Sequence, residues 1–404
     1  MKKITVGMLI FVVVLFGVLA LWRAAEQRKL VPPLSTIVEV PQPAPSEKPA
    51  PEQQQKLFTT HHLEKIKLPE GFQISVFAEV PDARSLAVSP SGVVFVSNRL
   101  QDKVYALIDS DKDGFANEVK VIAKGLNTPN GIALKNGDLY IATVNQILKL
   151  PQIESNLTNP PKPEVLYGGY PSDKLHGWKF IAFGPDGKLY VPVGAPCNNC
   201  LKDNPIYASI TRLDLGTKQL ETVAAGVRNS VGFDWQPETE NFWFTDNGRD
   251  QMGDDVPTDE LNMVEQLGAH FGFPFCHQGD VQDPSIQPRK PCSEFNAPKK
   301  KLSPHGAALG MRFYTGQLFP AEYQKQIFIA EHGSWNRKVP IGYRVMLAKL
   351  DANNTVTSYE PFADGWLQTN GEILGRPVDV AVWQDGSLLV TDDKSGLVYR
   401  ITYN

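Results

Sequence analysis

Apolar and polar positions follow a short pattern that recurs along most of the chain. Each unit has an apolar stretch, a turn containing Gly or Pro, and a second stretch rich in β-branched and aromatic residues. This pattern predicts two strands joined by a tight turn, because Gly adopts the positive φ that hairpin turns require. Six such units occur, at residues 86–96, 131–141, 181–191, 231–244, 311–329 and 380–390, the fifth being degenerate.

Six hairpin units at blade-like spacing predict a closed architecture. A ring of small sheets is the usual product of such radial repetition, and an open sandwich of similar hairpins is the alternative. Gly and Pro number 32 each, which is typical of frequent turns and unfavourable for long helices. The sequence therefore predicts an all-β fold, a six-bladed β-propeller, over residues 63–404.

The N-terminus has a different pattern. Lys2 and Lys3 precede a continuous apolar run, Ile4–Trp22, long enough to cross a bilayer as a helix. Residues 1–29 are therefore predicted to be an uncleaved signal anchor, with a cleaved and secreted form as the alternative. The two lysines favour a cytoplasmic N-terminus, which puts the rest of the chain on the periplasmic or extracellular side of the inner membrane.

A Pro- and Gln-rich stretch separates this anchor from the repeats. Seven prolines fall between Pro32 and Pro51, in a segment that is also rich in Gln and Glu. Such a composition is typical of an extended, disordered tether. Residues 30–62 are accordingly predicted to be a linker.

Charge and cysteine content limit the function classes. The net charge is −4, so no general basic surface favours nucleic-acid binding. The four cysteines are Cys197, Cys200, Cys276 and Cys292. Leu201 stands where covalent haem attachment needs a His, and the spacing does not suit a zinc knuckle. In an exported protein two disulfides are expected, with their pairing left open.

Polar and basic residues precede the first strand of each repeat. In a propeller these positions converge around the axis. The residues are Arg84, Asn130, His176, Arg228, Asn229, His305 and Arg376. Because buried cations need partners, this ring predicts an anionic ligand that carries several carboxylates.

Residues 68–402 resemble the quinoprotein sugar dehydrogenases, specifically the glucose/sorbosone dehydrogenase group of soluble aldose sugar dehydrogenases. The motifs that carry the resemblance are His176–Tyr190, Gly226–Gly232, Thr245–Asp250, Asp259–Asn262, Phe271–Pro274 and Gly375–Asp379. They follow one another in the order seen in that family. The resemblance implies an enzyme that oxidises a sugar or sugar aldehyde with bound pyrroloquinoline quinone (PQQ) and Ca²⁺.

The same resemblance implies roles for individual residues. His176 would be the general base, a role that suits its near-neutral pKa, and Arg228 would polarise the quinone oxygen. The cofactor would be held by Arg228, Asn229, Asn247, Arg337 and Arg376. Calcium would bind the backbone carbonyls of Gly248 and Arg249.

Several positions depart from the family pattern. Asn247 stands where a longer amide is usual, Arg249 where a Pro is usual, and Val378 where a second arginine is common. Arg337 is assigned in place of a family lysine, with a solvated loop charge as the alternative. These departures bear on affinity and substrate preference more than on the fold.

Two weaker signals lie outside the main motifs. Asp109, Asp111 and Asp113 match the first half of an EF-hand loop, but its twelfth position is Lys120. These three aspartates could form a second calcium site or belong to a polar turn between the first two blades, and the sequence does not decide between the two interpretations. Trp178 and Trp335 could equally face a sugar or pack in the core.

Other functions remain as alternatives to the dehydrogenase. A calcium-dependent lactonase would need acidic side chains at the axis, and a non-catalytic propeller would bind a partner protein or a glycan. The chain has no haem motif, so the dehydrogenase would need an external electron acceptor, a cytochrome or a quinone. The sequence does not specify the sugar.

Overall fold

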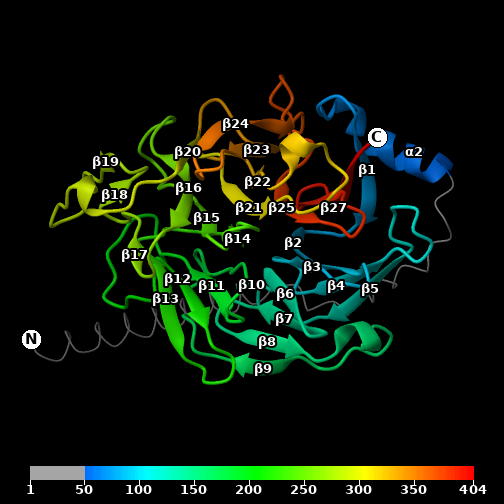
Figure 1. Cartoon of the computed structure of the whole chain (residues 1–404), viewed down its shortest axis with the longest axis horizontal. Helices are drawn as coiled ribbons and strands as arrows, with labels where there is room; N and C mark the ends of the chain where they lie inside the picture. Colours follow the sequence, from blue (N-terminus) through cyan, green and yellow to red (C-terminus); the bar gives the residue numbers. More distant parts are fainter. Residues whose placement is uncertain (1–50) are drawn as a thin grey trace, which may run out of the picture. The chain divides into compact units, whose positions relative to one another are not determined.

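A ring of β-sheets forms the protein over residues 51–404, the part of the chain that the structure, a computed structural model, describes (Figure 1). In this part, five sheets have four strands each and one has five, and a small two-stranded sheet lies outside the ring. The predicted six-bladed β-propeller is thereby confirmed. Neighbouring inner strands pack against one another around the ring, so each blade contributes one wall to the axis.

The first three blades follow the chain in order. Blade one consists of β2 (Ala83–Val88), β3 (Val94–Asn98), β4 (Val104–Ile108) and β5 (Glu118–Ala123). Blade two consists of β6 (Gly131–Lys135), β7 (Asp138–Ala142), β8 (Ile147–Leu150) and β9 (Glu164–Tyr167). Blade three consists of β10 (Ala182–Phe183), β11 (Leu189–Val193), β12 (Ser209–Leu213), β13 (Leu220–Ala225) and the parallel β17 (Ala269–His270).

Blades four and five carry the longest insertions. Blade four consists of β14 (Gly232–Trp235), β15 (Phe242–Asp246), β16 (Thr258–Val264) and β20 (Lys300–Pro304). The hairpin β18 (Cys276–His277) and β19 (Val281–Gln282) is inserted between β16 and β20. Blade five consists of β21 (Ala308–Phe313), β22 (Ile327–Glu331), β23 (Arg344–Leu350) and β24 (Val356–Ala363).

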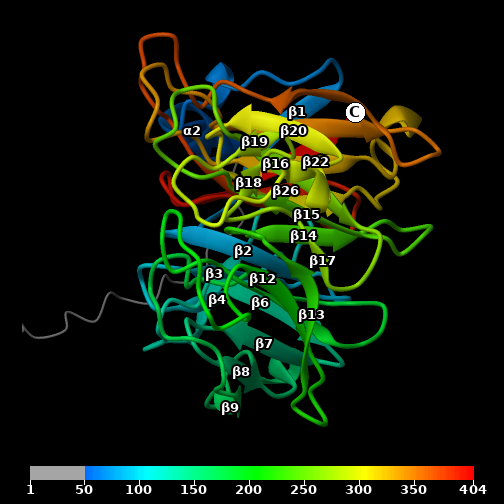
Figure 2. The same ribbon diagram turned by 90° about the vertical axis from the view of Figure 1, so that its left-hand side faces the viewer.

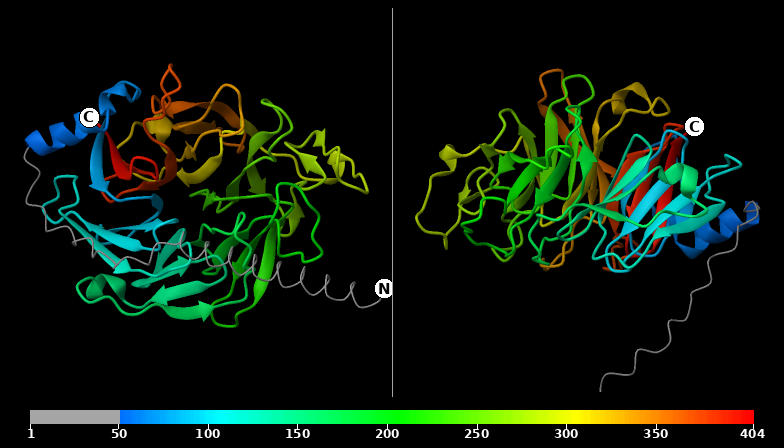
Figure 3. Two further views of the ribbon diagram at one scale, coloured as in Figure 1. Left: turned by 180° about the vertical axis from the view of Figure 1, so that it is seen from behind. Right: turned by 90° about the horizontal axis from the view of Figure 1, so that it is seen from below.

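The sixth blade closes the ring with both ends of the folded chain. Its inner strands are β25 (Pro377–Val382), β26 (Leu388–Asp392) and β27 (Leu397–Tyr403), and its outer strand is β1 (Phe72–Glu79). Figure 3 shows β1, in blue, antiparallel to β27, in red. Because the first strand completes the last blade, the ring has no open end between them.

Local sequence explains the hairpins that build each blade. Asn136 and Gly137 both have positive φ, 54° and 83°, in the two-residue turn between β6 and β7. This is the conformation that a tight hairpin turn needs, and Gly adopts it without steric cost. Along the ring, buried apolar residues from adjacent blades interleave, with Phe77, Phe95, Phe233 and Tyr399 almost fully buried.

The segment before the propeller is partly helical. Helix α2 (Pro51–Thr60) and the 3-10 turn η1 (Leu63–Lys65) precede β1, and Figures 1 and 2 show α2 beside β1. Leu57 and Phe58 pack against the core cluster under blades five and six. The end of the range assigned to a disordered linker is therefore a helix, because these two apolar side chains find a surface to cover.

Short 3-10 turns also occur at η2 (Ile153–Asn156), η3 (Cys292–Glu294) and η4 (Ala321–Tyr323). The predicted anchor, residues 1–29, and the first part of the predicted linker lie outside the described residues. Within residues 51–404 no helix combines the length and apolar character needed to cross a bilayer.

Both expected disulfides are present. Cys197 pairs with Cys200 across a four-residue loop, and Cys276 pairs with Cys292. The first joins two residues of the loop after β11, and the second ties β18 to η3. The sequence left the pairing open, and the structure joins the first cysteine to the second and the third to the fourth.

Candidate active site

A cavity of about 250 Å³ lies where the loops before the inner strands converge. Its lining includes five residues of the predicted ring together with two of the predicted cofactor and metal residues: Arg84, His176, Arg228, Asn229, His305, Asn247 and Gly248. These residues come from blades one, three, four and five and their connections. The repeat phase therefore brought distant polar residues to one place, as the sequence predicted.

His176 is held as a neutral imidazole. Its Nδ1 lies 2.7 Å from the carbonyl oxygen of Ala195, so Nδ1 carries the proton that is donated there and Nε2 is left as the basic nitrogen. Burial, and then the positive charge of Arg228, lower the pKa of His176 to about 4. The imidazole is consequently neutral at pH 7, and its pKa lies below the near-neutral value expected from the sequence.

The backbone around His176 is built for this close packing. His176 has φ 52°, in the left-handed region, and its side chain lies against Gly194. A Cβ on Gly194 would lie 2.5 Å from the Cβ of His176 and 2.9 Å from its carbonyl oxygen. Gly194 therefore permits the position of His176, because any larger residue would push it away.

Arg228 is clamped by four hydrogen bonds. Its Nε donates to the carbonyl of Asn198 at 2.9 Å, and Nη2 donates to the Asn198 Oδ1 and the Asp250 Oδ2, each at 2.9 Å. Nη1 donates to the Asn247 carbonyl at 3.2 Å. Asn198 itself belongs to the four-residue loop closed by Cys197–Cys200. The guanidinium is thereby fixed in orientation, with Asp250 as its counter-charge.

Two amides stand beside this arginine. Asn247 donates from Nδ2 to the carbonyls of Asn229 and Ala308, at 3.1 and 2.9 Å. The side chain of Asn229 makes no hydrogen bond within residues 51–404, although it is largely buried and lines the cavity. An amide in that position can still donate to and accept from a ligand.

Buried carboxylates brace the backbone of these loops. Asp246 accepts from the backbone N–H groups of Arg228 and Asn229, at 2.8 and 2.7 Å. Asp259 accepts from those of Gly248 and Ala308, at 2.8 and 2.9 Å. Burial raises the pKa of Asp246 to about 6 and that of Asp259 to about 7. Their role here is to hold the cavity wall.

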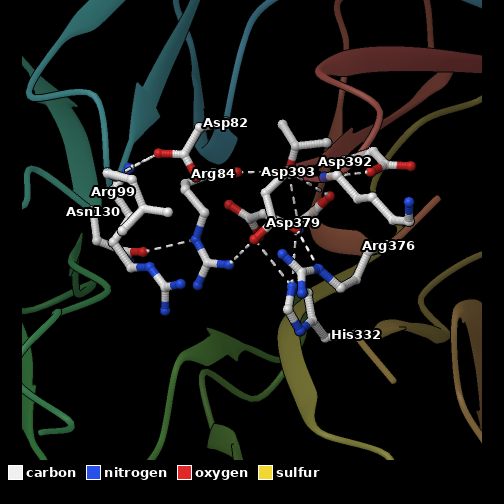
Figure 4. A network of polar contacts seen from close by, with 12 residues as sticks. Asp82, Arg84, Arg99, Asn130, His332, Arg376, Asp379, Asp392 and Asp393 are labelled. Carbon is white, nitrogen blue, oxygen red and sulfur yellow. Dashed lines mark hydrogen bonds and ion pairs between the residues drawn. The ribbon is translucent and has the colours of Figure 1, made fainter. Parts of the chain in front are cut away.

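Asp393 joins basic side chains of blades one, five and six (Figure 4). It accepts from Arg84 Nη1 at 2.8 Å, from Arg376 Nε at 2.7 Å and from His332 Nε2 at 3.1 Å. Arg84 Nε also donates to Asn130 at 3.1 Å. Burial alone would raise the pKa of Asp393, but the hydrogen bond from His332 and the charge of Arg84 hold it well below its usual range.

This network corrects one step of the sequence argument. The ring of cations was expected to need an external anion, yet Asp393 and Asp250 supply internal partners for Arg84, Arg376 and Arg228. The sequence pattern could not show this, since neither aspartate precedes an inner strand. At Asp393 one carboxylate serves two arginines, so Arg84 and Arg376 share a single ion-pair partner.

Asn130 and three other predicted residues lie apart from the cavity lining. Arg376 is more than a third exposed and points to Asp393. Arg337 pairs with Asp255 and donates to the Asp254 carbonyl. Arg249 forms an ion pair with the buried Asp283. The assignments of the Arg376 and Arg337 side chains to a cofactor stay predictions, and so does that of the Arg249 carbonyl to calcium.

The backbone carbonyls predicted to bind calcium are free. Within residues 51–404 no hydrogen bond is made to the carbonyl oxygen of Gly248 or of Arg249. Gly248 also lines the cavity. The Gly248 carbonyl, with that of its neighbour Arg249, is an oxygen ligand of the kind that Ca²⁺ takes.

The acidic loop of Asp109, Asp111 and Asp113 is gathered at one point. Their ligand oxygens lie within 4.8 Å of one another. Gly114 and Phe115 donate backbone N–H groups into the loop. The loop connects β4 to β5 inside blade one, so it is not a turn between two blades as the sequence alternative placed it.

Sequence reasoning missed several residues of the site. Asp393, Asp250, Asn198 and Arg99 follow second strands or lie in loops between strands, where the repeat phase gives no signal. Asp250 ends the quoted motif Thr245–Asp250 and could have been included. Both tryptophans that the sequence left undecided, Trp178 and Trp335, line the cavity.

Comparison with solved structures confirms the resemblance at the level of fold. A calcium structure of a *Trichoderma reesei* enzyme of carbohydrate-active family AA12 matches with a TM-score of 0.74 at 18% identity, covering 84% of this chain and 97% of that one. The holo form of the pyranose dehydrogenase PQQ domain of *Coprinopsis cinerea* matches with 0.71 at 18%, covering 83% and 97%. The PQQ-bound aldose sugar dehydrogenase of *Streptomyces coelicolor* matches with 0.59 at 17%, covering 84% and 100%.

Comparison of sequences identifies a family. An uncharacterized protein of *Borreliella burgdorferi* is 32% identical over 352 residues, which cover 84% of this chain and 91% of that protein. The model of DUF7133, a domain of unknown function, matches residues 59–393, which include nearly the whole propeller. The chain therefore belongs to the DUF7133 family.

Proposed function

We propose that this protein is a quinoprotein dehydrogenase that oxidises the carbinol of an aldose or a related sugar, with PQQ and Ca²⁺ as cofactors. The observation that carries the proposal is the pairing of a neutral His176 with a fixed Arg228 on one wall of the cavity. The fold shared with PQQ-containing sugar dehydrogenases supports it.

The residues present fit both cofactors. PQQ is a flat molecule with several carboxylates, and the cavity has more guanidinium charge than paired carboxylate on the Asp393 side. The free amide of Asn229 and the amide of Asn247 lie beside Arg228. The unused carbonyls of Gly248 and Arg249 would hold Ca²⁺, and Arg228, Asn229, Asn247, Arg337 and Arg376 would hold the quinone.

The chain's own residues divide the work of the oxidation. His176 Nε2 would take the hydroxyl proton of the carbinol while the carbon gives up its hydride, so an alcohol becomes a carbonyl with the loss of two electrons and two protons. PQQ, when bound, supplies the acceptor of that hydride, with Ca²⁺ as Lewis acid. Arg228 would stabilise the negative charge that develops beside it. An external cytochrome or quinone would then accept the electrons.

Export to the periplasmic or extracellular side belongs to the same proposal. An apolar N-terminal run that follows two lysines suits export. The two disulfides of the folded part suit an oxidising compartment. An uncleaved anchor would keep the propeller at the membrane, close to a membrane electron acceptor.

The lactonase alternative finds less support. Of the carboxylates that line the cavity, Asp250 pairs with Arg228 and Asp259 accepts two backbone N–H groups. Neither is left open toward the axis as a metal ligand, whereas a hydrolase of that kind needs a set of such oxygens.

Reconstitution tests the proposed function. The full chain, purified in detergent, would be supplied with PQQ and Ca²⁺, a panel of sugars and an electron-accepting dye. We expect turnover that requires both additions and is lost in His176→Ala, while His62→Ala, a change at an exposed histidine, keeps it. Absence of PQQ binding in the presence of Ca²⁺ would overturn the proposal.

A further inference from the structure

Arg99 is a cation of the cavity whose guanidinium has no hydrogen-bond or ion-pair partner in the described part of the chain. It lies just after β3 and lines the cavity. Within residues 51–404 no hydrogen bond or ion pair reaches its guanidinium, whose Nε is buried and unsatisfied; only its backbone N–H donates, to Asp82. Figure 4 shows that contact and none from the guanidinium. Burial, and then the nearby charge of Arg84, lower the pKa of Arg99.

The carboxylates near Arg99 are already engaged. Asp393 serves Arg84, Arg376 and His332, and Asp82 accepts the backbone N–H groups of Arg99 and Leu100. Asp379 accepts from the backbone of blades one and six. A third guanidinium thus stands on the side of the cavity where one carboxylate already balances two arginines.

The position of Arg99 points to the substrate. Its guanidinium carbon lies 4.9 Å from the centre of the Trp178 ring, and that ring is edge-to-face with His176 at 6.1 Å between centroids. Contact with an aromatic face leaves the N–H groups at the edge of a guanidinium free for a bidentate acceptor. A ligand held by Arg99 would therefore be adjacent to the base that acts on the substrate hydroxyl.

We propose that Arg99 and Trp178 form a carboxylate subsite, and that the substrate class is a sugar that carries a carboxylate, such as a uronate or an aldonate. This inference rests on the proposed function for its link to oxidation, but the binding it predicts does not. Two parallel N–H···O bonds would hold the carboxylate at Arg99 while the sugar ring places a carbinol at His176.

Binding to the full chain without PQQ tests the subsite directly. Titration calorimetry would compare glucuronate with glucose, on the wild type and on Arg99→Gln, Arg99→Lys and Arg289→Gln, a matched change at an exposed arginine. We expect glucuronate to bind at least about 10-fold more tightly than glucose, the ratio set by one charge-assisted bidentate contact. Arg99→Gln should abolish the preference, Arg99→Lys should keep part of it, and Arg289→Gln should leave it unchanged.

The outcomes separate this inference from the proposed function. Equal binding of the two sugars by the wild type would overturn the subsite. If Arg99→Gln loses PQQ affinity but keeps the glucuronate preference, the subsite is also overturned, and Arg99 is a cofactor-binding residue instead. Arg99-dependent binding of glucuronate in a protein that does not bind PQQ would sustain the subsite and defeat the dehydrogenase. Thermal melting of each variant identifies one that has not folded.

Discussion

The two arginine clusters of the cavity are organised in opposite ways. Arg228 has a carboxylate of its own, Asp250, together with three acceptors from Asn198 and Asn247. At the other cluster a single carboxylate, Asp393, serves both Arg84 and Arg376. The first cluster fixes the orientation of one side chain, while the second concentrates positive charge around one shared anion. A site that must both position a group and attract an anion needs both arrangements.

The largest effect is expected where charges share one partner. Asp393→Asn leaves the buried Arg84 without its counter-charge and also removes the partner of the partly exposed Arg376. Because Arg84 is buried, we expect the free energy of unfolding to fall by about 3–5 kcal/mol. Urea denaturation at neutral pH measures it. Glu238→Gln, which removes a surface pair with Lys325, should cost less than about 1 kcal/mol. Equal losses for the two variants would contradict the comparison.

A smaller loss is expected at the other cluster. Asp250→Asn removes the only carboxylate that pairs with Arg228 in the described part of the chain, but the acceptors from Asn198 and Asn247 remain. We expect a fall of about 1–3 kcal/mol in the free energy of unfolding, measured in the same way. If Asp250→Asn costs as much as Asp393→Asn, the extra acceptors do not have the stabilising role assigned to them.

The disulfide loop sharpens the comparison through geometry. Replacing Cys197 and Cys200 with Ser should free the loop that holds Asn198 against Arg228, and we expect kcat of the reconstituted enzyme to fall about 10-fold with little change in KM. The same replacement at Cys276 and Cys292 breaks a disulfide whose residues make no hydrogen bond to Arg228 in the described part of the chain. If kcat falls by the same factor in that second variant, the loss comes from a general decrease in the rigidity of the fold and not from the loop that holds Asn198.

The smallest effect is a shift in the pKa of His176. Arg228→Met removes a positive charge that lowers this pKa, so the pKa should rise from about 4, while burial keeps it below 6.5. Arg84→Met should leave the pKa of His176 unchanged, since Asp393 balances the charge of Arg84. NMR titration of the histidine ring measures both. An equal shift in the two variants would remove the distinction between the clusters.

The sign of the accompanying stability change follows from the same pKa. Folded His176 binds its proton more weakly than the unfolded chain, whose pKa is 6.5, so acid favours unfolding. Its contribution to stability is present above pH 6.5 and is lost as the pH falls toward 4. Because Arg228→Met raises the pKa of folded His176, the pH range over which this stability is lost should begin at 6.5 as before but end at a higher pH than in the wild type.

The sequence by itself determined the architecture and the main wall of the site. Hairpin units recur with apolar stretches and Gly turns, and a propeller is the closed form that buries their faces. Because inner strands begin at one end of the axis, the phase of the repeats also predicted that Arg84, His176, Arg228 and Asn229 would meet. Periodicity is a local property, so it can be read without knowing the contacts.

Only the tertiary structure decided how the charges are partnered. Asp393 and Asp250 lie in loops outside the repeat phase, so nothing local marks them as the counter-ions of Arg84 and Arg228. The orphaned guanidinium of Arg99 could not be predicted either, because having no partner is a property of the whole neighbourhood. Burial and distance set the strength of a charge interaction, and both arise only when the ring closes.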